Sequence, residues 1–196
     1  MEAALEQIVH SLSVALGERH SGTRFHSERV IGLSRALGIQ IDLSEKEMQV
    51  LTMGARLHDI GKIAIPDRVL TKPSSFEEAE WECMKQHPLI GERIVKAIGD
   101  KQALEVATIV RHHHEHFDGS GYPDKLEGTA IPLFSRIISL ADSYDAITEC
   151  RAYHKARSHR EVMDILVAET GIKHDPDLLH AFCAVVDKPE NRPGLA

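Results

Sequence analysis

Apolar residues recur three or four positions apart along almost the whole chain, and no segment alternates apolar and polar residues as a half-buried strand would. Near the N-terminus this spacing is carried by Leu5, Val9 and Leu16. A chain with this pattern buries helical faces against one another. We therefore expect an all-α fold: a single compact multi-helix bundle over residues 1–187 and a flexible tail over residues 188–196.

Capping and turn residues divide the chain into its expected helices. Ser44 and Glu47 predict a capping box at a helix start, and Pro88 and Pro132 suit first helical positions. Helix ends are expected at Gly17, Gly38 and Gly61. Beyond the first helix, helices are expected over about 20–37, 44–60, 77–87, from Pro88 onward, and over 101–116, 132–148, 158–170 and 176–186. The intervals 62–76 and 118–124 are predicted to be loops.

Length, charge and cysteine content exclude several classes of protein. The 196 residues suffice for one ordinary domain. A formal net charge of -7 argues against nonspecific binding to a nucleic-acid backbone, so we expect no DNA partner. No apolar run approaches the roughly 20 residues that cross a bilayer, and no secretory leader opens the sequence. We therefore expect a cytoplasmic location, without a membrane span in this segment or a disulfide framework among its widely spaced cysteines.

The strongest local signal for chemistry is the adjacent pair His58 and Asp59, near an expected helix end. An imidazole nitrogen and a carboxylate that reach one point suit Fe, Mn, Ni or Zn better than Ca or Mg. An ordinary helix terminus with two polar residues is the alternative. Further candidates are His87 before a proline, the run His112-His113-His114, and Asp142 inside an apolar helix.

Asp142 has two possible environments. If its carboxylate is buried, a cation or strong hydrogen-bond donors must compensate it, because an unpaired buried charge is costly. If it lies on the exposed side of an amphipathic helix, it needs no partner. Ile138, Ala141 and Asp145 share one helical face and Asp142 lies beside that face, so spacing alone leaves both alternatives open.

Taken together, these residues resemble the HD-GYP family of HD phosphohydrolases. The resemblance covers about residues 20–183, and its motifs follow the order of the family. They are His58-Asp59-Ile60-Gly61-Lys62-Ile63-Ala64-Ile65-Pro66-Asp67, Lys72-Pro73, Trp81, Met84-Lys85-Gln86-His87-Pro88, His113-His114-Glu115, Asp118-Gly119-Ser120-Gly121-Tyr122-Pro123, Arg136-Ile137 and Ala141-Asp142-Ser143-Tyr144-Asp145-Ala146. The pair His58-Asp59 alone would be weak evidence, but the whole ordered set is specific.

The resemblance implies a site for two divalent transition metal ions, with Fe or Mn favoured and Ni or Zn as alternatives. Asp59 would bridge the two ions. The other implied ligands are His26, His58 and Asp142 for one ion, and His87, His113 and His114 for the other. Some family members have a glutamate one turn before the first histidine. This chain has Gly22 there, so we predict two ions rather than three.

The resemblance also implies roles near the substrate. Asp59 and Lys62 are the predicted catalytic residues, and Lys62 is also expected to bind a phosphate oxygen. Arg151 and Lys155 are expected to bind substrate, with Arg151 on the second phosphate. Where the family often has another positively charged side chain, this chain has His154. Phosphate binding is therefore expected to be weaker or pH-sensitive. Solvated surface positions are the alternative for Lys62 and Arg151.

The signature motif Gly121-Tyr122-Pro123 follows a glycine-rich turn. The resemblance places it near the site or on a surface that docks diguanylate cyclase (GGDEF) domains, and the alternative is that it only fixes a tight turn. Glu115, which precedes this loop, is expected to orient a ligand histidine.

The function implied by the resemblance is a metal-dependent phosphodiesterase. It would hydrolyse cyclic di-GMP to pGpG through a water activated by two metal ions, with GMP as a possible further product. One alternative is an HD phosphohydrolase for another cyclic dinucleotide. Another is a noncatalytic module that senses cyclic di-GMP or docks on GGDEF domains. The presence of all the implied metal ligands weighs against this last hypothesis.

Overall fold

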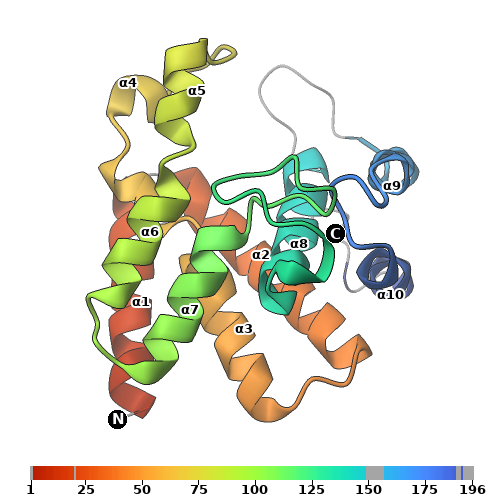
Figure 1. The fold of residues 1–196 in the computed structure, drawn as a ribbon, viewed down its shortest axis with the longest axis horizontal. Coiled ribbons are helices and arrows are strands. Elements are labelled where there is room, and N and C mark those ends of the chain that lie inside the picture. Colours follow the sequence, from red (N-terminus) through yellow and green to blue (C-terminus); the bar gives the residue numbers. More distant parts are fainter. Residues whose placement is uncertain (1, 20, 149–156, 189–190, 192–196) are drawn as a thin grey trace.

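The computed structural model describes residues 2–19, 21–148, 157–188 and 191, and in this part of the chain helices are joined by loops without a β-strand (Figure 1). The all-α prediction is therefore confirmed. None of the helices in the described part is both long and apolar enough to span a membrane. The helices are α1 (Glu2–Arg19), α2 (Ser21–Gln40), α3 (Glu45–Leu57), α4 (Asp67–Leu70), α5 (Glu78–Met84), α6 (His87–Lys96), α7 (Lys101–His112), α8 (Leu133–Thr148), α9 (His159–Ala168) and α10 (Pro176–Val186), with 3-10 helices η1 (Ile60–Ala64) and η2 (Gly128–Ala130).

Local capping chemistry determines several helix starts. Ser44 and Glu47 form the predicted capping box, in which the Ser44 hydroxyl accepts from the Glu47 amide and the Glu47 carboxylate accepts from the Ser44 amide. The same reciprocal pair, Ser158 and Glu161, starts α9. Pro88 lies in the first turn of α6 as expected.

Several of the boundary predictions are wrong. Helix α1 continues past Gly17 to Arg19, and α2 continues through Gly38 to Gln40. Gly38 serves close packing instead, because a Cβ there would lie only 2.8 Å from the Met48 side chain of α3. The segment 62–76, expected to be a loop, contains most of η1 and the four-residue α4, which is too short to show a helical repeat in the sequence.

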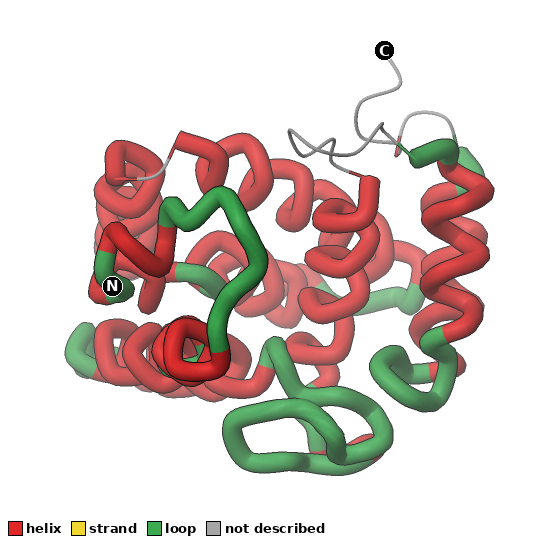
Figure 2. Tube along the Cα trace, turned by 90° about the horizontal axis from the view of Figure 1, so that it is seen from above, coloured by secondary structure: helices red, strands yellow, loops and turns green. Residues whose placement is uncertain are grey.

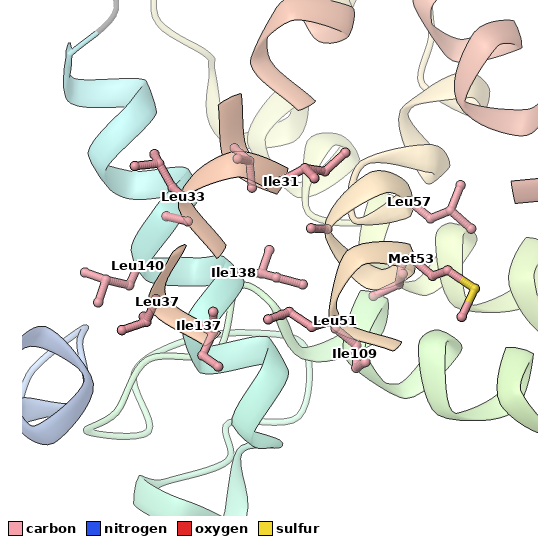
Figure 3. Packing of buried hydrophobic residues seen from close by; sticks show 14 of the residues in the cluster. Ile31, Leu33, Leu37, Leu51, Met53, Leu57, Ile109, Ile137, Ile138 and Leu140 are labelled. Carbon is pink, nitrogen blue, oxygen red and sulfur yellow. The ribbon is translucent and has the colours of Figure 1, made fainter. Parts of the chain in front are cut away.

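The core surrounds α2, which packs against α1, α3, α8 and α10. Figure 3 shows side chains from α2, α3, α7 and α8 meeting in this core, among them Leu37, Leu51, Ile109 and Ile138, all of which are buried. Burial of such side chains supplies the main driving force for the fold. The core holds the ends of these helices at fixed positions, and the candidate site lies at those ends.

Two segments project from this core. Helices α4 and α5 lie at the upper left of Figure 1 and pack on a small apolar cluster of their own, formed by Ile65, Val69 and Met84. The long loop between α7 and α8 lies at the edge of the helical body in Figure 2. Both segments lie beside the candidate site described next.

Candidate metal centre

Two helix ends and one helix start bring the central residues together. His58 and Asp59 follow the last turn of α3, His87 opens α6, and His113 caps α7. Gly61 permits this convergence, because a Cβ there would lie 1.9 Å from the carbonyl oxygen of His87. The side chains of α2 and α8 close the site from the other side, through His26 and Asp142.

Asp59 lies at the centre and faces two groups of ligand atoms. Its Oδ1 is 3.4 Å from His87 Nε2. Its Oδ2 is 3.4 Å from His58 Nε2 and 3.9 Å from His26 Nε2. Two sets of side chains around Asp59 could each hold a metal ion: His26, His58 and Asp59, and His87, His113 and His114. The Asp59 carboxylate therefore directs one oxygen toward each set.

His58, His87 and His113 are oriented by one repeated hydrogen bond. In each, Nδ1 donates to the carbonyl oxygen three residues earlier, at 2.7 Å in His58, 2.8 Å in His87 and 2.7 Å in His113. A carbonyl only accepts, so the proton is on Nδ1 and the lone pair of Nε2 points into the site. This is the tautomer in which an imidazole binds a metal ion through Nε2.

Two features of these lone pairs fit a bound cation. His58 Nε2 is buried and has no hydrogen-bond partner in the described part of the protein. The Nε2 atoms of His87 and His113 are 3.3 Å apart, although both carry lone pairs that would repel each other without a cation or proton. Nitrogens about 2.0–2.1 Å from a shared ion can have such a separation. The donor set, imidazoles with carboxylates, suits a divalent transition metal.

The two sets differ in their electrostatics. Burial lowers the pKa of His87 to about 4 and that of His113 to about 3, so both are neutral near pH 7. Burial also opposes a charge on His26, but its hydrogen bonds to Asp142 and Asp145 outweigh burial and raise its pKa to about 10. The His26 side is therefore rich in negative charge, and a cation that binds there has to displace a proton.

The titration of the buried imidazoles predicts a loss of stability in acid for the protein without metal ions. Between the lowered pKa values of His87 and His113 and the ordinary value of 6.5, the unfolded chain binds protons that the folded protein does not. The free energy of unfolding therefore rises with pH in this window. His26 contributes in the opposite direction near pH 6.5, because only its unfolded form loses the proton there, but this offsets only part of the effect of the two other histidines. We expect urea unfolding in the presence of a chelator to show a decrease of at least about 2 kcal/mol between about pH 7 and pH 5. An unchanged value would contradict these environments.

Asp145 and Arg29 are parts of the site that the sequence did not predict. His26 Nδ1 donates to Asp145 Oδ2 at 2.7 Å, while Arg29 donates to both Asp145 oxygens at 2.6 and 3.0 Å. Asp145 is buried, so the Arg29 guanidinium compensates its charge. The spacing along the sequence could have indicated these two residues. Arg29 lies three residues after His26, and Asp145 lies three residues after Asp142, so each pair shares a helical face.

Replacement of Asp145 by Asn is expected to weaken metal binding without removing a ligand. The amide can no longer act as a charged acceptor for His26 Nδ1, so the ring loses basicity and orientation. We expect the affinity for Mn²⁺, measured by isothermal titration calorimetry, to fall by about 10–100-fold. Glu28→Gln, at an exposed position of the same helix, is the matched control and should bind as the wild type does. Equal affinities for both variants would contradict this role of Asp145.

Asp142 is partly buried, so its environment is intermediate between the buried and the exposed positions that the sequence left open. Its side chain is 21% exposed, and its Oδ1 is 3.2 Å from His26 Nε2. Burial by itself raises the pKa of Asp142, but His26 and the neighbouring histidines outweigh it and hold the pKa well below the usual range. Asp142 is therefore an ionised carboxylate beside the His26 set.

The signature motif lies beside the site. Tyr122 stacks on His114, with ring centroids 5.0 Å apart and planes 27° apart. Gly121 allows the loop to pack closely against the backbone that follows α7, because a Cβ there would lie 2.2 Å from the backbone nitrogen of His116. Lys62 points to Asp59, with its Nζ 2.6 Å from Oδ2, and its side chain is 27% exposed. Lys62 is thus placed where it touches both the central carboxylate and solvent.

Glu115 holds the loop rather than a histidine. Its two oxygens accept from the backbone amides of Asp124 and Leu126, at 2.7 and 3.2 Å. Asp124 in turn accepts two hydrogen bonds from Arg111 and one from His112. Although His112, Glu115 and Asp124 lie close enough to hold an ion, Arg111 already supplies the positive charge. These contacts attach the motif loop to α7.

The structure brings together all the residues predicted as metal ligands, but two predicted substrate contacts lie outside the described residues. These are Arg151 and Lys155, together with the neighbouring His154. Convergence of side chains does not by itself establish which of them bind metal. The assignment of ligands therefore belongs to the proposal that follows from the geometry and the similarities below.

Comparison with known proteins gives a family match and several relatives. A profile described as HD domain matches residues 5–178. The cyclic di-GMP phosphodiesterase response regulator RpfG of Xanthomonas campestris pv. campestris is 39% identical over 182 residues, which cover 93% of this chain and 48% of that protein. The 3'3'-cGAMP-specific phosphodiesterase 2 of Vibrio cholerae is 34% identical over 175 residues, covering 89% of this chain and 33% of that protein. The chain thus spans about half or less of the length of these relatives.

Among solved structures, a cyclic GMP-AMP specific phosphodiesterase of V. cholerae, V-cGAP3, has a similar fold. The TM-score is 0.71 with 24% sequence identity, and the match covers 95% of this chain and 50% of that one. At this identity the similarity supports the shared helical architecture alone. It agrees with the all-α bundle described above.

Proposed function

This chain belongs to the HD domain family, and on that premise we propose that it is a metal-dependent phosphodiesterase that hydrolyses cyclic di-GMP to pGpG. Of the curated relatives compared above, one is named for cyclic di-GMP and one for 3'3'-cGAMP. The more similar of the two is the cyclic di-GMP phosphodiesterase, so we place this substrate first. Further hydrolysis to GMP is a second step that the same proposal allows.

The observation that carries the proposal is the position of Asp59 between two sets of histidine and carboxylate side chains. One oxygen faces His87 at 3.4 Å and the other faces His58 at 3.4 Å. We propose that Asp59 is shared by two ions. The remaining proposed ligands are His26, His58 and Asp142 for one ion, and His87, His113 and His114 for the other.

Two divalent ions held there, Fe or Mn in our proposal and Ni or Zn as alternatives, would activate a water molecule and neutralise phosphoryl oxygens. The chain itself orients the ligand imidazoles through their Nδ1 hydrogen bonds and excludes bulk water by burying them. Lys62, which is partly exposed and bonded to Asp59, would donate to a nonbridging phosphate oxygen. Arg151 and Lys155 are proposed to contact the second phosphate.

A noncatalytic sensor and a phosphohydrolase for another cyclic dinucleotide are the alternatives. GGDEF domains are proposed partners, and a cytoplasmic location is proposed with them. In the described part of the chain, His58 Nε2 is buried without a hydrogen-bond partner, which supports the bound metal ion that the enzymatic proposal requires.

The proposal is tested by incubating Mn- or Fe-loaded protein with cyclic di-GMP under reducing conditions and separating the products by chromatography. We expect pGpG to accumulate in the presence of metal and to be absent after chelation. Parallel incubation with 3'3'-cGAMP ranks the two substrates by kcat/KM. Tight binding of cyclic di-GMP with no product would overturn the enzymatic proposal and favour the sensor.

A further inference from the structure

A line of aromatic rings leads from the candidate metal centre to the protein surface. His114 belongs to the second ligand set and stacks on Tyr122. The ring of Tyr122 meets Trp81 of α5 edge to face, with centroids 6.0 Å apart and planes 81° apart. Trp81 in turn lies nearly parallel to Phe76, with centroids 6.3 Å apart and planes 19° apart. The outer two rings are thus linked to the site by direct contacts.

Helix packing explains only part of this arrangement. Phe76 precedes the N-cap Glu77, and Trp81 lies in the next turn, so the two form the hydrophobic staple that accompanies the capping box of Glu77 and Glu80. The staple fixes the orientation of the indole. It does not bury it, because Trp81 remains 43% exposed and Phe76 37% exposed. A fixed aromatic surface therefore faces solvent beside the site.

We propose that the exposed rings of Trp81 and Phe76 form a stacking platform for one nucleobase of the cyclic dinucleotide whose phosphate lies at the metal centre. This inference rests on the proposed function. In a nucleotide only a ribose separates the base from the phosphate, so a phosphate near His114 places its base within reach of the adjacent rings. Purine bases stack on exposed aromatic side chains, and such stacking depends little on which purine is present.

The platform would contribute to substrate binding at a distance from the reacting phosphate. Its surface is aromatic, and the carboxylates of Glu77 and Glu80, at the start of α5, are paired with Lys72. These charges are paired with one another, so the surface offered by the two rings suits an uncharged base. The platform thus separates recognition of the base from recognition of the phosphate, which is left to Lys62 and the metal ligands.

Because Trp81 is the only tryptophan in the chain, its fluorescence reports on the platform directly. We would titrate Mn-loaded protein with a phosphorothioate analogue of cyclic di-GMP that resists hydrolysis, and with dimethyl phosphate as a diester without a base. The analogue is expected to quench Trp81 fluorescence saturably, and dimethyl phosphate is expected to leave it unchanged. Binding of the analogue by calorimetry without any change in fluorescence would overturn the platform.

Kinetics of variants provide the second test. Trp81→Ala is expected to raise KM for cyclic di-GMP by about 10–100-fold, with kcat and metal content close to those of the wild type. Trp81→Phe should recover most of the loss, and Leu104→Ala, which removes an exposed apolar side chain of α7, should change nothing. A fall in kcat or in metal content, without a change in KM, would instead indicate a purely structural role for Trp81.

Failure of the platform and failure of the proposed function give different results. If wild-type protein hydrolyses cyclic di-GMP and Trp81→Ala has the same KM, the function stands and the platform is wrong. If wild-type protein retains its metal but neither binds the analogue nor hydrolyses cyclic di-GMP, the proposed function is wrong, and the platform falls with it.

Discussion

Asp59→Asn is expected to abolish both metal binding and phosphodiester hydrolysis while the protein stays helical. Asn offers one neutral oxygen in place of two charged ones, so it cannot serve both ligand sets. Because the ions would supply several kcal/mol of charge stabilisation, we expect kcat/KM to fall by on the order of a thousandfold. Mass spectrometry should detect almost no metal bound to this variant.

The position of Asp59 makes this effect larger than that of any single histidine. Each histidine belongs to one set, whereas Asp59 faces His87 with one oxygen and His58 with the other. Desolvation works against the charge of Asp59, but Lys62 and the surrounding imidazoles more than offset it and keep its pKa well below the usual range. The carboxylate is therefore ionised and available to cations at any pH near neutrality.

Asp164→Asn is the matched control, because Asp164 is an exposed carboxylate on α9. It should retain wild-type metal content and turnover. Thermal unfolding adds a readout independent of activity. Added Mn²⁺ should raise the Tm of the wild type and of the control, but not that of Asp59→Asn, because only the first two bind the ion preferentially in the folded state. Full activity of Asp59→Asn would contradict the proposed bridging role of Asp59.

The helices were predictable because their signals are local. Ser44 and Glu47 lie within one turn of each other, so a short stretch of sequence contains the whole capping box. Helix α4 was missed because four residues cannot show a period of 3.6. Gly38 was misassigned because a glycine at a helix end and a glycine at a helix contact look the same in sequence, and only the neighbouring Met48 distinguishes them.

The candidate site was predictable only through the family resemblance. Nothing in the spacing of His26, His87 and His113 states that α2, α6 and α7 bring them to one place, because tertiary packing decides this. The role of Asp145 was missed for a related reason. Asp142 and Asp145 are both carboxylates in one apolar helix, and only the structure shows which one faces Arg29. The contact between Trp81 and Tyr122 likewise depends on how the loop that carries Tyr122 packs, which the sequence does not show.

Gly61→Ala is expected to have the largest effect on stability. The added Cβ would lie 1.9 Å from the carbonyl oxygen of His87 and 2.7 Å from the amide nitrogen of Gly91. Both are backbone atoms of α6, so no side-chain rotation relieves the contact and the helix itself has to move. We expect the free energy of unfolding, from urea denaturation, to fall by about 3 kcal/mol.

Gly32→Ala separates this packing effect from the general effect of replacing glycine. Gly32 lies in α2, and a Cβ there meets nothing within 4 Å. That substitution should stabilise the protein by about 0.5–1 kcal/mol, because alanine loses less backbone entropy on folding. The same chemical change thus has opposite signs at the two positions. A displaced α6 also moves His87, so folded Gly61→Ala should bind Mn²⁺ more weakly, whereas Gly32→Ala should not. Stability of Gly61→Ala within 1 kcal/mol of the wild type would show that α6 does not depend on the close approach at this glycine.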